Sequence, residues 1–559
     1  MTIKKSVNFQ DIIKYGLLAG LIALSLSAIG FITLLGEREL ISISGFFTLG
    51  HVFLFAAPLA LAFTIAEKTH QESKAKSIGY GFAIGAIAAL PLVLLIFAAS
   101  AVDIRQFLVN VSPELITLLT FGQSLGVGSL LLALSFGLVG AFAAIVSVLP
   151  PKIRRPVINS LSWTLIAGTF SEILLGRIRS LFGRGFAKLI FSGEALNPLF
   201  AVILLVAVAG VTVWWDSRGS GIKSQFANLS PVKQKKLQRS RIAFGIILML
   251  VLPLILGSYL TEVTNNVGLY ILMGLGLNIV VGFAGLLDLG YVAFFAIGAY
   301  VMGILTSEGA LGLGFTFWTA LPFSVITATF AGIILGIPVL GMRGDYLAIV
   351  TLGFGEIIRI LALSDLFKPY IGGAQGVLQI PKPSIFGIAL VKPEQLYYII
   401  LAGVLLAAFI AWRLRDSRLG RQWMAMREDE DVAEAMGINL VKTKLMAFAT
   451  GAAFSGLSGA IFASKLTSIF PHSFNLIISI NVLSLIIVGG IGSLPGVVVG
   501  SMILVGLPEL LREFAEHRML MYGILLIVMM LAKPEGFWPS EVNRRELHAH
   551  DELETANSD

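Results

Sequence analysis

The residues whose types and spacing could do chemistry are concentrated in one charged segment, residues 415–442, between two long apolar runs. It holds an acidic run, Glu428–Asp431. An apolar stripe crosses the charged background at Trp423, Met424, Met426, Val432, Ala435 and Met436. Exposed Met and Trp on a short amphipathic helix are typical of an adaptable protein-docking surface. The spacing predicts one helix over residues 421–437, which Gly437 would end.

The alternative is a helix that lies on lipid headgroups. Anionic lipid would repel the acidic run Glu428–Asp431, so docking to a protein is the favoured interpretation. If the segment docks rigidly, movement of the partner would pass directly into the apolar run that follows it.

No residues are placed for catalysis or for ATP binding. The chain has no cysteine, and its six histidines are scattered without paired spacing on a helix. The segment Gly219–Ser224 lacks the four-residue spacer of a phosphate-binding loop. We therefore expect no enzyme, no metal site and no ATP site, although an ATPase in a separate subunit could drive the chain.

The composition is that of a membrane protein. Of 559 residues, 56% are hydrophobic and 13% are charged, and the mean hydropathy is +0.89. Soluble domains carry about a quarter charged residues. Apolar runs of nearly 20 residues recur, each long enough to cross a bilayer as a helix, and alternating strand patterns are missing. The predicted fold class is all-α, a polytopic transmembrane helical bundle. The net charge of +7 indicates a positive-inside bias rather than nucleic-acid binding.

A basic linker, residues 216–241, divides the chain into two halves. Its basic side chains outnumber its acids, which predicts a cytoplasmic position. We expect an N-terminal membrane extension of about six spans over 1–215 and a second membrane domain of about ten spans over 242–540. The tail 541–559 is polar and predicted to be disordered.

Charge bias and span parity predict the topology. In the first half, spans are expected near 15–35, 47–66, 78–100, 125–149 and 196–215. In the second half they are expected at 242–261, 267–285, 289–307, 316–341, 343–363, 396–414, 443–464, 476–493, 495–512 and 519–532. This order places both termini, Arg343 and the loop 415–442 inside, and it places 364–395 outside.

Residues 157–176 leave two interpretations open. If they cross, the basic stretch with Arg177, Arg179, Arg184 and Lys188 lies outside, against the charge rule. If they form an amphipathic surface helix, the parity of the first half fails. The count of six spans assumes that they cross.

Polar groups at membrane depth are costly and face protein or water. The candidates for a translocation pathway are Asn278, Asp288, Glu356, Arg359 and Asn481. Glu356 and Arg359 share a helix face and could form a structural ion pair instead. The two asparagines could equally join helices by hydrogen bonds. Close packing is the simpler role, and a gating break the alternative, for the glycines Gly489, Gly490, Gly492 and Gly496.

The segment Glu434–Asn439, together with the segments given below in family order, resembles the LivM-type permeases of branched-chain amino acid ABC importers. Glu434, Ala435 and Gly437 occupy the places of the EAA-G signature of the ABC-permease coupling loop. Where the family usually has Ser-Leu-Gly-His, this chain has Asp288–Tyr291. The other matching segments are Gly276–Leu286, Phe294–Tyr300, Arg343–Arg359, Lys442–Lys444, Phe448–Ala463, Val488–Gly496 and Lys533–Gly536.

The resemblance implies an inner-membrane permease subunit that translocates leucine, isoleucine, valine or related amino acids. It implies a LivH-like second permease, two LivG/LivF-like cytoplasmic ATPases, an extracytoplasmic binding protein and surrounding lipid as partners. The expected ATPase coupling helix comprises Gly420, Arg421, Trp423, Met426, Arg427, Glu428, Glu434, Ala435, Met436 and Gly437. The alternatives are a urea or short-chain amide permease of the same architecture, an ion-coupled secondary transporter, and a structural or signalling membrane protein.

Overall fold

The computed structural model describes residues 9–510 except 44–46, 70–72, 103, 228–230, 310 and 311. It also describes residues 523, 526, 527, 533 and 535–539. The predicted tail 541–559 and most of the predicted span 519–532 lie outside the described residues, as do most side chains of the basic linker. The chain forms two compact units, Met1–Ile242 and Ala243–Asp559, and each is described by itself.

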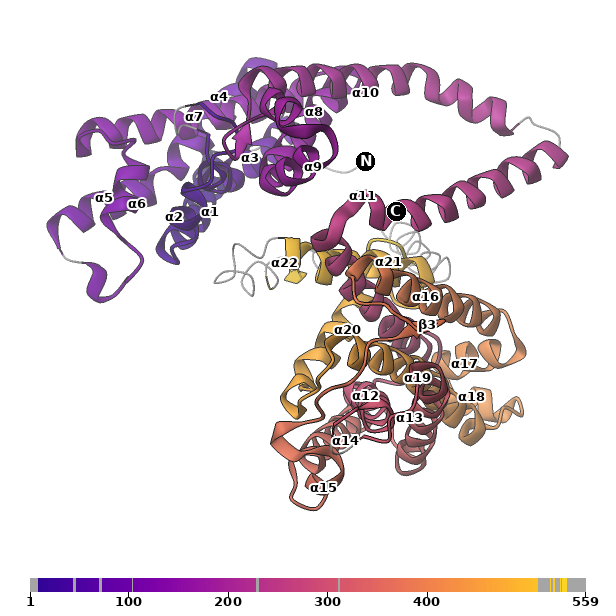
Figure 1. Cartoon of the computed structure of the whole chain (residues 1–559). Coiled ribbons are helices and arrows are strands. Elements are labelled where there is room, and N and C mark those ends of the chain that lie inside the picture. Colours follow the sequence, from indigo (N-terminus) through magenta and orange to yellow (C-terminus); the bar gives the residue numbers. More distant parts are fainter. Residues whose placement is uncertain are drawn as a thin grey trace. The chain divides into compact units, whose positions relative to one another are not determined.

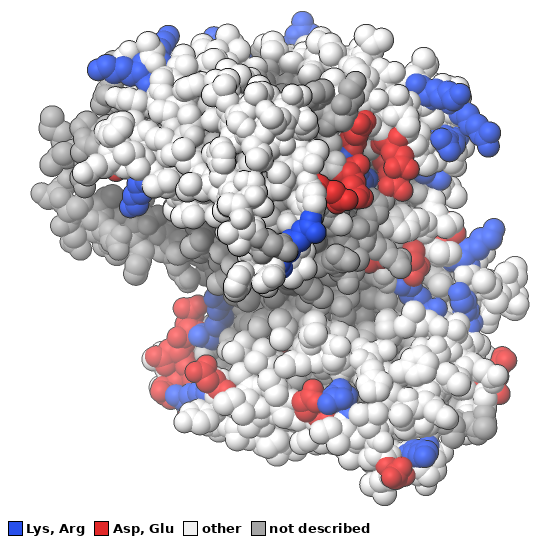
Figure 2. Space-filling view, turned by 90° about the vertical axis from the view of Figure 1, so that its left-hand side faces the viewer, with Lys and Arg blue, Asp and Glu red and all other residues white. Residues whose placement is uncertain are grey.

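Both units are helical, which confirms the predicted all-α class. Among the described residues, eleven helices are long and apolar enough to cross a membrane. The strands form only two short antiparallel hairpins in this part of the chain, β1 (Phe191–Ser192) with β2 (Ala195–Leu196) and β3 (Ser384–Ile385) with β4 (Ile388–Ala389). Figure 2 shows charged side chains in small groups separated by broad uncharged areas, as expected for a lipid-facing surface.

The first unit contains ten α-helices within the described residues (Figure 1): α1 (Phe9–Ala28), α2 (Phe31–Gly36), α3 (Leu49–Thr69), α4 (Lys74–Ala88), α5 (Leu90–Ala101), α6 (Pro113–Leu119), α7 (Leu125–Val148), α8 (Pro151–Thr169), α9 (Ser171–Ile190) and α10 (Pro198–Ala227). The apolar run 15–35 is not one helix, because Gly30 has a positive φ of 87° between α1 and α2. Helices α4 and α7 approach closely: a Cβ on Gly85 would lie 2.1 Å from the carbonyl oxygen of Phe136.

Contacts near both of its ends place α8 alongside α3. In its first turn, Arg154 Nη1 lies 2.9 Å from Glu67 Oε1, near the end of α3. At its other end Gly168 packs against Leu40, which precedes α3. The connection after α9 returns to the same place, because Leu196 N donates to Leu40 O. Helix α8 alone is not among the eleven candidate spans, and it passes the same test only together with α9, as a pair bent by 76°. Both interpretations of residues 157–176 therefore stay predictions, and the helix itself covers 151–169.

The division between the two units falls within α11 (Pro231–Leu277), after Ile242. The second unit contains the remainder of α11 and the other helices in the described part of the chain (Figure 1). They are η2 (Asn278–Phe283, a π-helix), α12 (Val292–Thr306), α13 (Phe317–Val339), α14 (Asp345–Leu363), α15 (Lys368–Ile371), η3 (Gly373–Gln375), α16 (Pro393–Arg415), α17 (Arg418–Glu428), α18 (Glu430–Ala435), α19 (Leu440–Leu466), η4 (Pro471–Ser473), α20 (Leu476–Gly489), α21 (Leu494–Ser501), η5 (Met502–Gly506, also π) and α22 (Leu507–Leu510).

Helix α11 is broken at Gly257, where φ is 72° and ψ is 177°. Only glycine adopts this conformation readily, so the break follows from the residue type. The predicted gap between the spans 242–261 and 267–285 thus lies a few residues earlier than expected.

Helix α19 lies at the centre of the second unit, with α12 and α13 packed against it (Figure 1). Small residues set these contacts. A Cβ on Gly459 would lie 2.0 Å from Phe295 O of α12, and a Cβ on Gly332 of α13 would lie 2.6 Å from Ala452 Cβ. In lipid the hydrophobic effect does not drive helices together, so they associate through close backbone contacts at small residues such as glycine.

Contacts at the two ends of α19 show at which end of the helix each loop of this unit lies. At one end Lys465 Nζ lies 2.7 Å from Glu262 Oε1, and nearby Val377 pairs with Ile469. At the other end Lys444 contacts Glu430. The loop 364–392 therefore lies at the end of α19 opposite the loop 416–439, as the predicted parity requires.

Candidate functional site

The charged loop between α16 and α19 folds as two helices, α17 and α18. Asp429 between them is extended, with φ −157° and ψ 115°. Its Oδ1 accepts hydrogen bonds of 2.9 Å from the backbone N–H groups of Asp431 and Val432. The prediction of a single helix over 421–437 is wrong, because Asp429 caps a second helix instead of continuing the first.

Gly437 ends the second helix as predicted. Its φ of 85° is left-handed. Its N–H donates to Glu434 O at 2.9 Å, and the N–H of Ile438 donates to Ala433 O at 3.1 Å. These bonds satisfy carbonyls that the helix end would otherwise leave free.

The predicted exposed stripe is wrong for Trp423 and Met426. Trp423 and Met426 are buried in the core of the second unit, 0% and 1% exposed. The Trp423 indole Nε1 donates to Thr443 O at 2.9 Å, which fastens α17 to the first turn of α19. Gly420 is also required for packing, since a Cβ there would lie 2.2 Å from Leu414 O. Amphipathic spacing alone could not tell which partner covers the apolar face.

Arg427 fastens α17 to the π-helix η2. Its Nη1 donates to Gly282 O at 2.7 Å, and its stem packs against Gly285. Gly285 has a positive φ of 72° at the point where η2 ends. The end of α17 is therefore held by a second element far away in the sequence.

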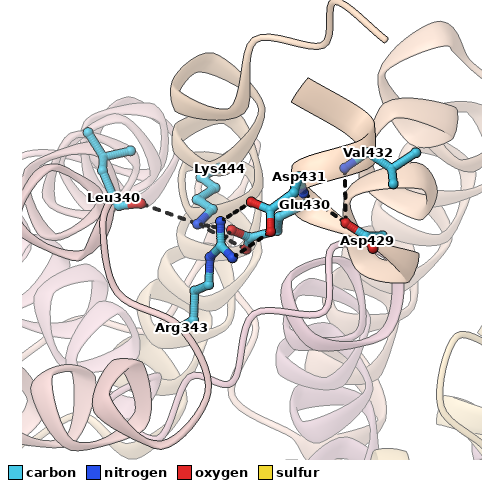
Figure 3. Close-up of polar contacts among 7 residues, drawn as sticks. All are labelled: Leu340, Arg343, Asp429, Glu430, Asp431, Val432 and Lys444. Atoms are coloured by element: carbon cyan, nitrogen blue, oxygen red, sulfur yellow. Dashed lines mark hydrogen bonds and ion pairs between the residues drawn. The ribbon is translucent and has the colours of Figure 1, made fainter. Parts of the chain in front are cut away.

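A cluster of four charged side chains fastens α18 (Figure 3). Lys444 of α19 lies 3.0 Å from Glu430 Oε1 and donates to Leu340 O at 3.2 Å. From the turn between α13 and α14, Arg343 Nε lies 2.9 Å from Glu430 Oε2 and Nη2 lies 2.7 Å from Asp431 Oδ1. We call Arg343, Glu430, Asp431 and Lys444 the ion cluster.

The ion cluster has an exposed and a buried side. Arg343 and Asp431 are exposed, and their hydrogen bond and opposite charges raise the pKa of Arg343 and lower the pKa of Asp431. The Lys444 side chain is only 3% exposed and that of Glu430 18%. A buried cation needs such partners, so this contact fixes where α18 lies on α19. Sequence reasoning missed this role. The available signal was one arginine in a short turn opposite an acidic run.

What remains exposed on the loop is a smaller face, which we call the docking face. Its apolar members are Val432, 58% exposed, and Met436, 80% exposed. Glu428, Glu434, Ala435 and Gly437 are exposed beside them, and so is Arg421. The signature residues of the loop are thus presented outward, while its aromatic anchor faces inward.

Two of the polar residues at membrane depth join helices. Asn278 is fully buried, and its Oδ1 accepts from Gly492 N at 2.9 Å. Asn481 of α20 hydrogen-bonds the Tyr270 hydroxyl of α11. These contacts support the interhelical role considered for both asparagines.

Asp288 lies in an irregular connection, residues 284–291, between η2 and α12. It is fully buried, and its Oδ1 accepts from Gly290 N at 2.9 Å. Thr351 of α14 holds the same connection, because its Oγ1 accepts from Leu289 N at 3.0 Å. The carboxyl therefore faces protein and stabilises a local turn. Serine, the usual family residue at this place, could accept the same hydrogen bond.

Glu356 and Arg359 form the ion pair that their spacing indicates, with Arg359 Nη2 2.7 Å from Glu356 Oε2. Their side chains are 34% and 28% exposed, on a face of α14 that also exposes Ile357 and Ile360. The pair is therefore available to a pathway or to a second subunit beside this face.

The glycine cluster combines close packing with a break. Gly490 and Gly492 have positive φ values of 117° and 78° in the turn between α20 and α21. A Cβ on Gly489 would lie 2.0 Å from Gly496 O, so the two helices meet backbone to backbone. Both roles considered from the sequence are compatible with this geometry.

These features define a polytopic helical permease with a helical loop clamped at one end of its bundle. Residues 259–532 match the protein family described as "branched-chain amino acid transport system / permease component". The permease protein LivM of Escherichia coli K12 is 39% identical over 393 residues, covering 63% of this chain and 91% of LivM. The chain belongs to this LivM-type family of branched-chain amino acid transport permeases.

More distant relatives also match. The probable branched-chain amino acid transport permease LivM of Methanocaldococcus jannaschii is 24% identical, covering 49% of this chain and 91% of the relative. The permease LivH of Salmonella typhimurium is 25% identical, covering 50% of this chain and 94% of the relative. No solved structure matches this chain significantly.

Proposed function

We propose that this chain is the permease subunit of an ABC importer for branched-chain amino acids, and that its docking face receives a separate ATPase. The observation that carries the proposal is the clamped loop. Trp423, Arg427 and the ion cluster fasten α17 and α18 to three other parts of the bundle, while Val432 and Met436 stay exposed. Adaptable apolar side chains beside acids suit a protein partner.

The clamps give a mechanism for coupling. A displacement of α18 is passed through Lys444 to α19 and through Arg343 to the turn before α14. A displacement of α17 is passed through Arg427 to η2, whose Asn278 bonds Gly492 in the glycine break. One docking event thereby acts on the elements that surround the candidate pathway.

The relatives supply the substrate and the partners of the proposal. Two relatives that are 39% identical to this chain are named as high-affinity branched-chain amino acid transport permeases. The similarity to both LivM and LivH supports a second, related permease beside this chain. We propose two cytoplasmic ATPases and an extracytoplasmic binding protein as the other subunits. The chain itself hydrolyses no ATP, and both termini lie in the cytoplasm.

Cross-linking tests the docking face. Because the chain has no native cysteine, each introduced cysteine is the single reactive thiol of this subunit. Single cysteines at Val432 and Met436 should cross-link to the ATPase in the assembled importer. Cysteines at the buried Met426 and Ala433 should not, nor should one at Lys382 in the opposite loop. The purified chain alone should have no ATPase activity. Failure of both exposed cysteines in an importer that still transports would refute the assignment.

A further inference from the structure

Helix α9 of the first unit is a basic amphipathic helix that does not run through the bundle. It is bent by 76° from α8, and Gly183 divides it with a left-handed φ of 86°. The two arms stay together at the kink, where the Phe182 and Phe186 rings lie 5.3 Å apart.

Both ends of α9 are held at one level of the bundle. Near its start, Leu175 and Ile178 pack with Ala167, in the last turn of α8. At its end, Ile190 packs in the same cluster with Phe200, in the first turn of α10. Helix α9 therefore lies where α8 ends and α10 begins, beside α8 (Figure 1).

Helix α10 begins at this level, and its segment Pro198–Arg218 is long and apolar enough to cross a membrane. An amphipathic helix beside the start of such a span meets the headgroup layer. The opposite end of the unit carries exposed Lys68, Lys76 and Lys152. The cations of α9 therefore form a group separate from those lysines, near the opposite end of α8.

The exposed side chains of α9 combine two kinds of chemistry. Leu181, Phe182, Phe186 and Leu189 are 50%, 65%, 47% and 68% exposed. Arg179, Arg184 and Lys188 are exposed among them. Large apolar side chains interleaved with cations are typical of helices that lie in the headgroup layer, where hydrocarbon covers the apolar groups and phosphate pairs with the cations.

We propose that α9 lies in the headgroup layer and binds anionic phospholipid. Arg179, Arg184 and Lys188 bind the phosphate oxygens, and Phe182 and Leu189 insert between acyl chains. A docked acidic protein would leave such large apolar groups in water until it arrived, so lipid is the better occupant. The proposal concerns the first unit and does not rest on the proposed function.

Spin labels on the full chain in lipid nanodiscs test the proposal. Phe182→Cys and Leu189→Cys each introduce a single labelling site, because the native chain has no cysteine. In discs that contain phosphatidylglycerol, both labels should be accessible to oxygen and protected from a water-soluble nickel chelate. A label at Met436→Cys, on the polar loop, should show the reverse.

Charge variants test the lipid preference. Replacing Arg179, Arg184 and Lys188 by Gln should weaken the binding of α9 to phosphatidylglycerol, measured from the protection of the Phe182 label, by about a hundredfold. Each cation contributes about fivefold to this binding. Arg179→Lys with Arg184→Lys should preserve it, which separates charge from folding. Replacing Lys68, Lys76 and Lys152 by Gln should leave this local signal unchanged.

Three results would overturn the proposal. One is a label that stays accessible to nickel in the presence of phosphatidylglycerol. Another is an equal effect of the two triple replacements. The third is protection that appears only when an extracytoplasmic binding protein is added, which would assign the surface to that protein.

Discussion

Lys444 and Glu430 form a largely buried ion pair, with Nζ 3.0 Å from Oε1, between the N-terminal part of α19 and the first turn of α18. The ammonium also donates to Leu340 O at 3.2 Å (Figure 3). A cation whose side chain is 3% exposed is costly to bury without such acceptors. The pair therefore couples the position of the docking face to that of the central helix.

Lys444→Met should destabilise the second unit by about 1–3 kcal/mol, because it leaves Leu340 O and one oxygen of Glu430 without a donor. Thermal unfolding of the purified chain measures this loss. In the assembled importer, ATP hydrolysis should continue with reduced uptake. Lys442→Met, on the exposed side of the same turn, is the matched control. Equal losses in the two variants would remove the special role of the pair.

The outer half of the ion cluster should respond to acid. The hydrogen bond from Arg343 lowers the pKa of Asp431 below its usual 3.8. Ionised Asp431 therefore stabilises the contact fully at neutral pH, and the contact weakens as pH falls through the lowered pKa. A spin label at Val432 should gain mobility in that acidic range and at high salt. Asp431→Asn should make the label mobile already at neutral pH, and an unchanged pH profile in that variant would contradict the assignment.

Gly290→Ala should disrupt the connection that carries Asp288. The new Cβ would lie 1.8 Å from Thr351 O, which belongs to a packed helix and cannot move freely. The expected cost is about 1–3 kcal/mol or more. Gly353→Ala, on the same helix as Thr351 and with no atom within 4 Å of its Cβ position, should change stability by less than about 1 kcal/mol. Thermal unfolding of both variants gives the comparison, which fails if they melt alike.

Glu356→Gln should separate stability from transport. The pair with Arg359 is about one-third exposed, so its loss should cost less than about 1 kcal/mol. We expect lower uptake by the assembled importer with the melting temperature nearly unchanged, because the charge lies on an open face of α14. Uptake and stimulated ATPase activity equal to those of the parent would reduce Glu356 to a tolerated surface residue.

The linker and the loop at 416–439 should be labelled from the side of the membrane opposite to the loop at 364–392. Cysteines at Lys235, Lys236 and Met436 should react with an impermeant reagent only from the cytoplasm, and a cysteine at Lys382 only from outside. Inside-out and right-side-out vesicles provide the two accesses. Labelling of Lys382 and Lys236 from one side would overturn the ten-span order of residues 242–540.

The sequence by itself determined the helical membrane class, because apolar runs of span length admit few other solutions. It also located most helices of the second unit to within a few residues, since each run is bounded by charge, Gly or Pro. Local chemistry was equally readable. Gly437 ends a helix because its type permits a positive φ, and Glu356 pairs with Arg359 because three residues place them on one face.

Only the tertiary structure decided what covers each face. Trp423 and Met426 looked like a docking stripe, yet the chain's own α19 and η2 bury α17. Arg343 meets the neighbouring pair Glu430 and Asp431 from 88 residues before Asp431, whereas Lys444 lies 14 residues after Glu430. Only the contacts with Glu67 and Leu40 place α8 alongside α3. Amphipathic spacing fixes which side of a helix is buried, but the partner is set by long-range packing that no local pattern encodes.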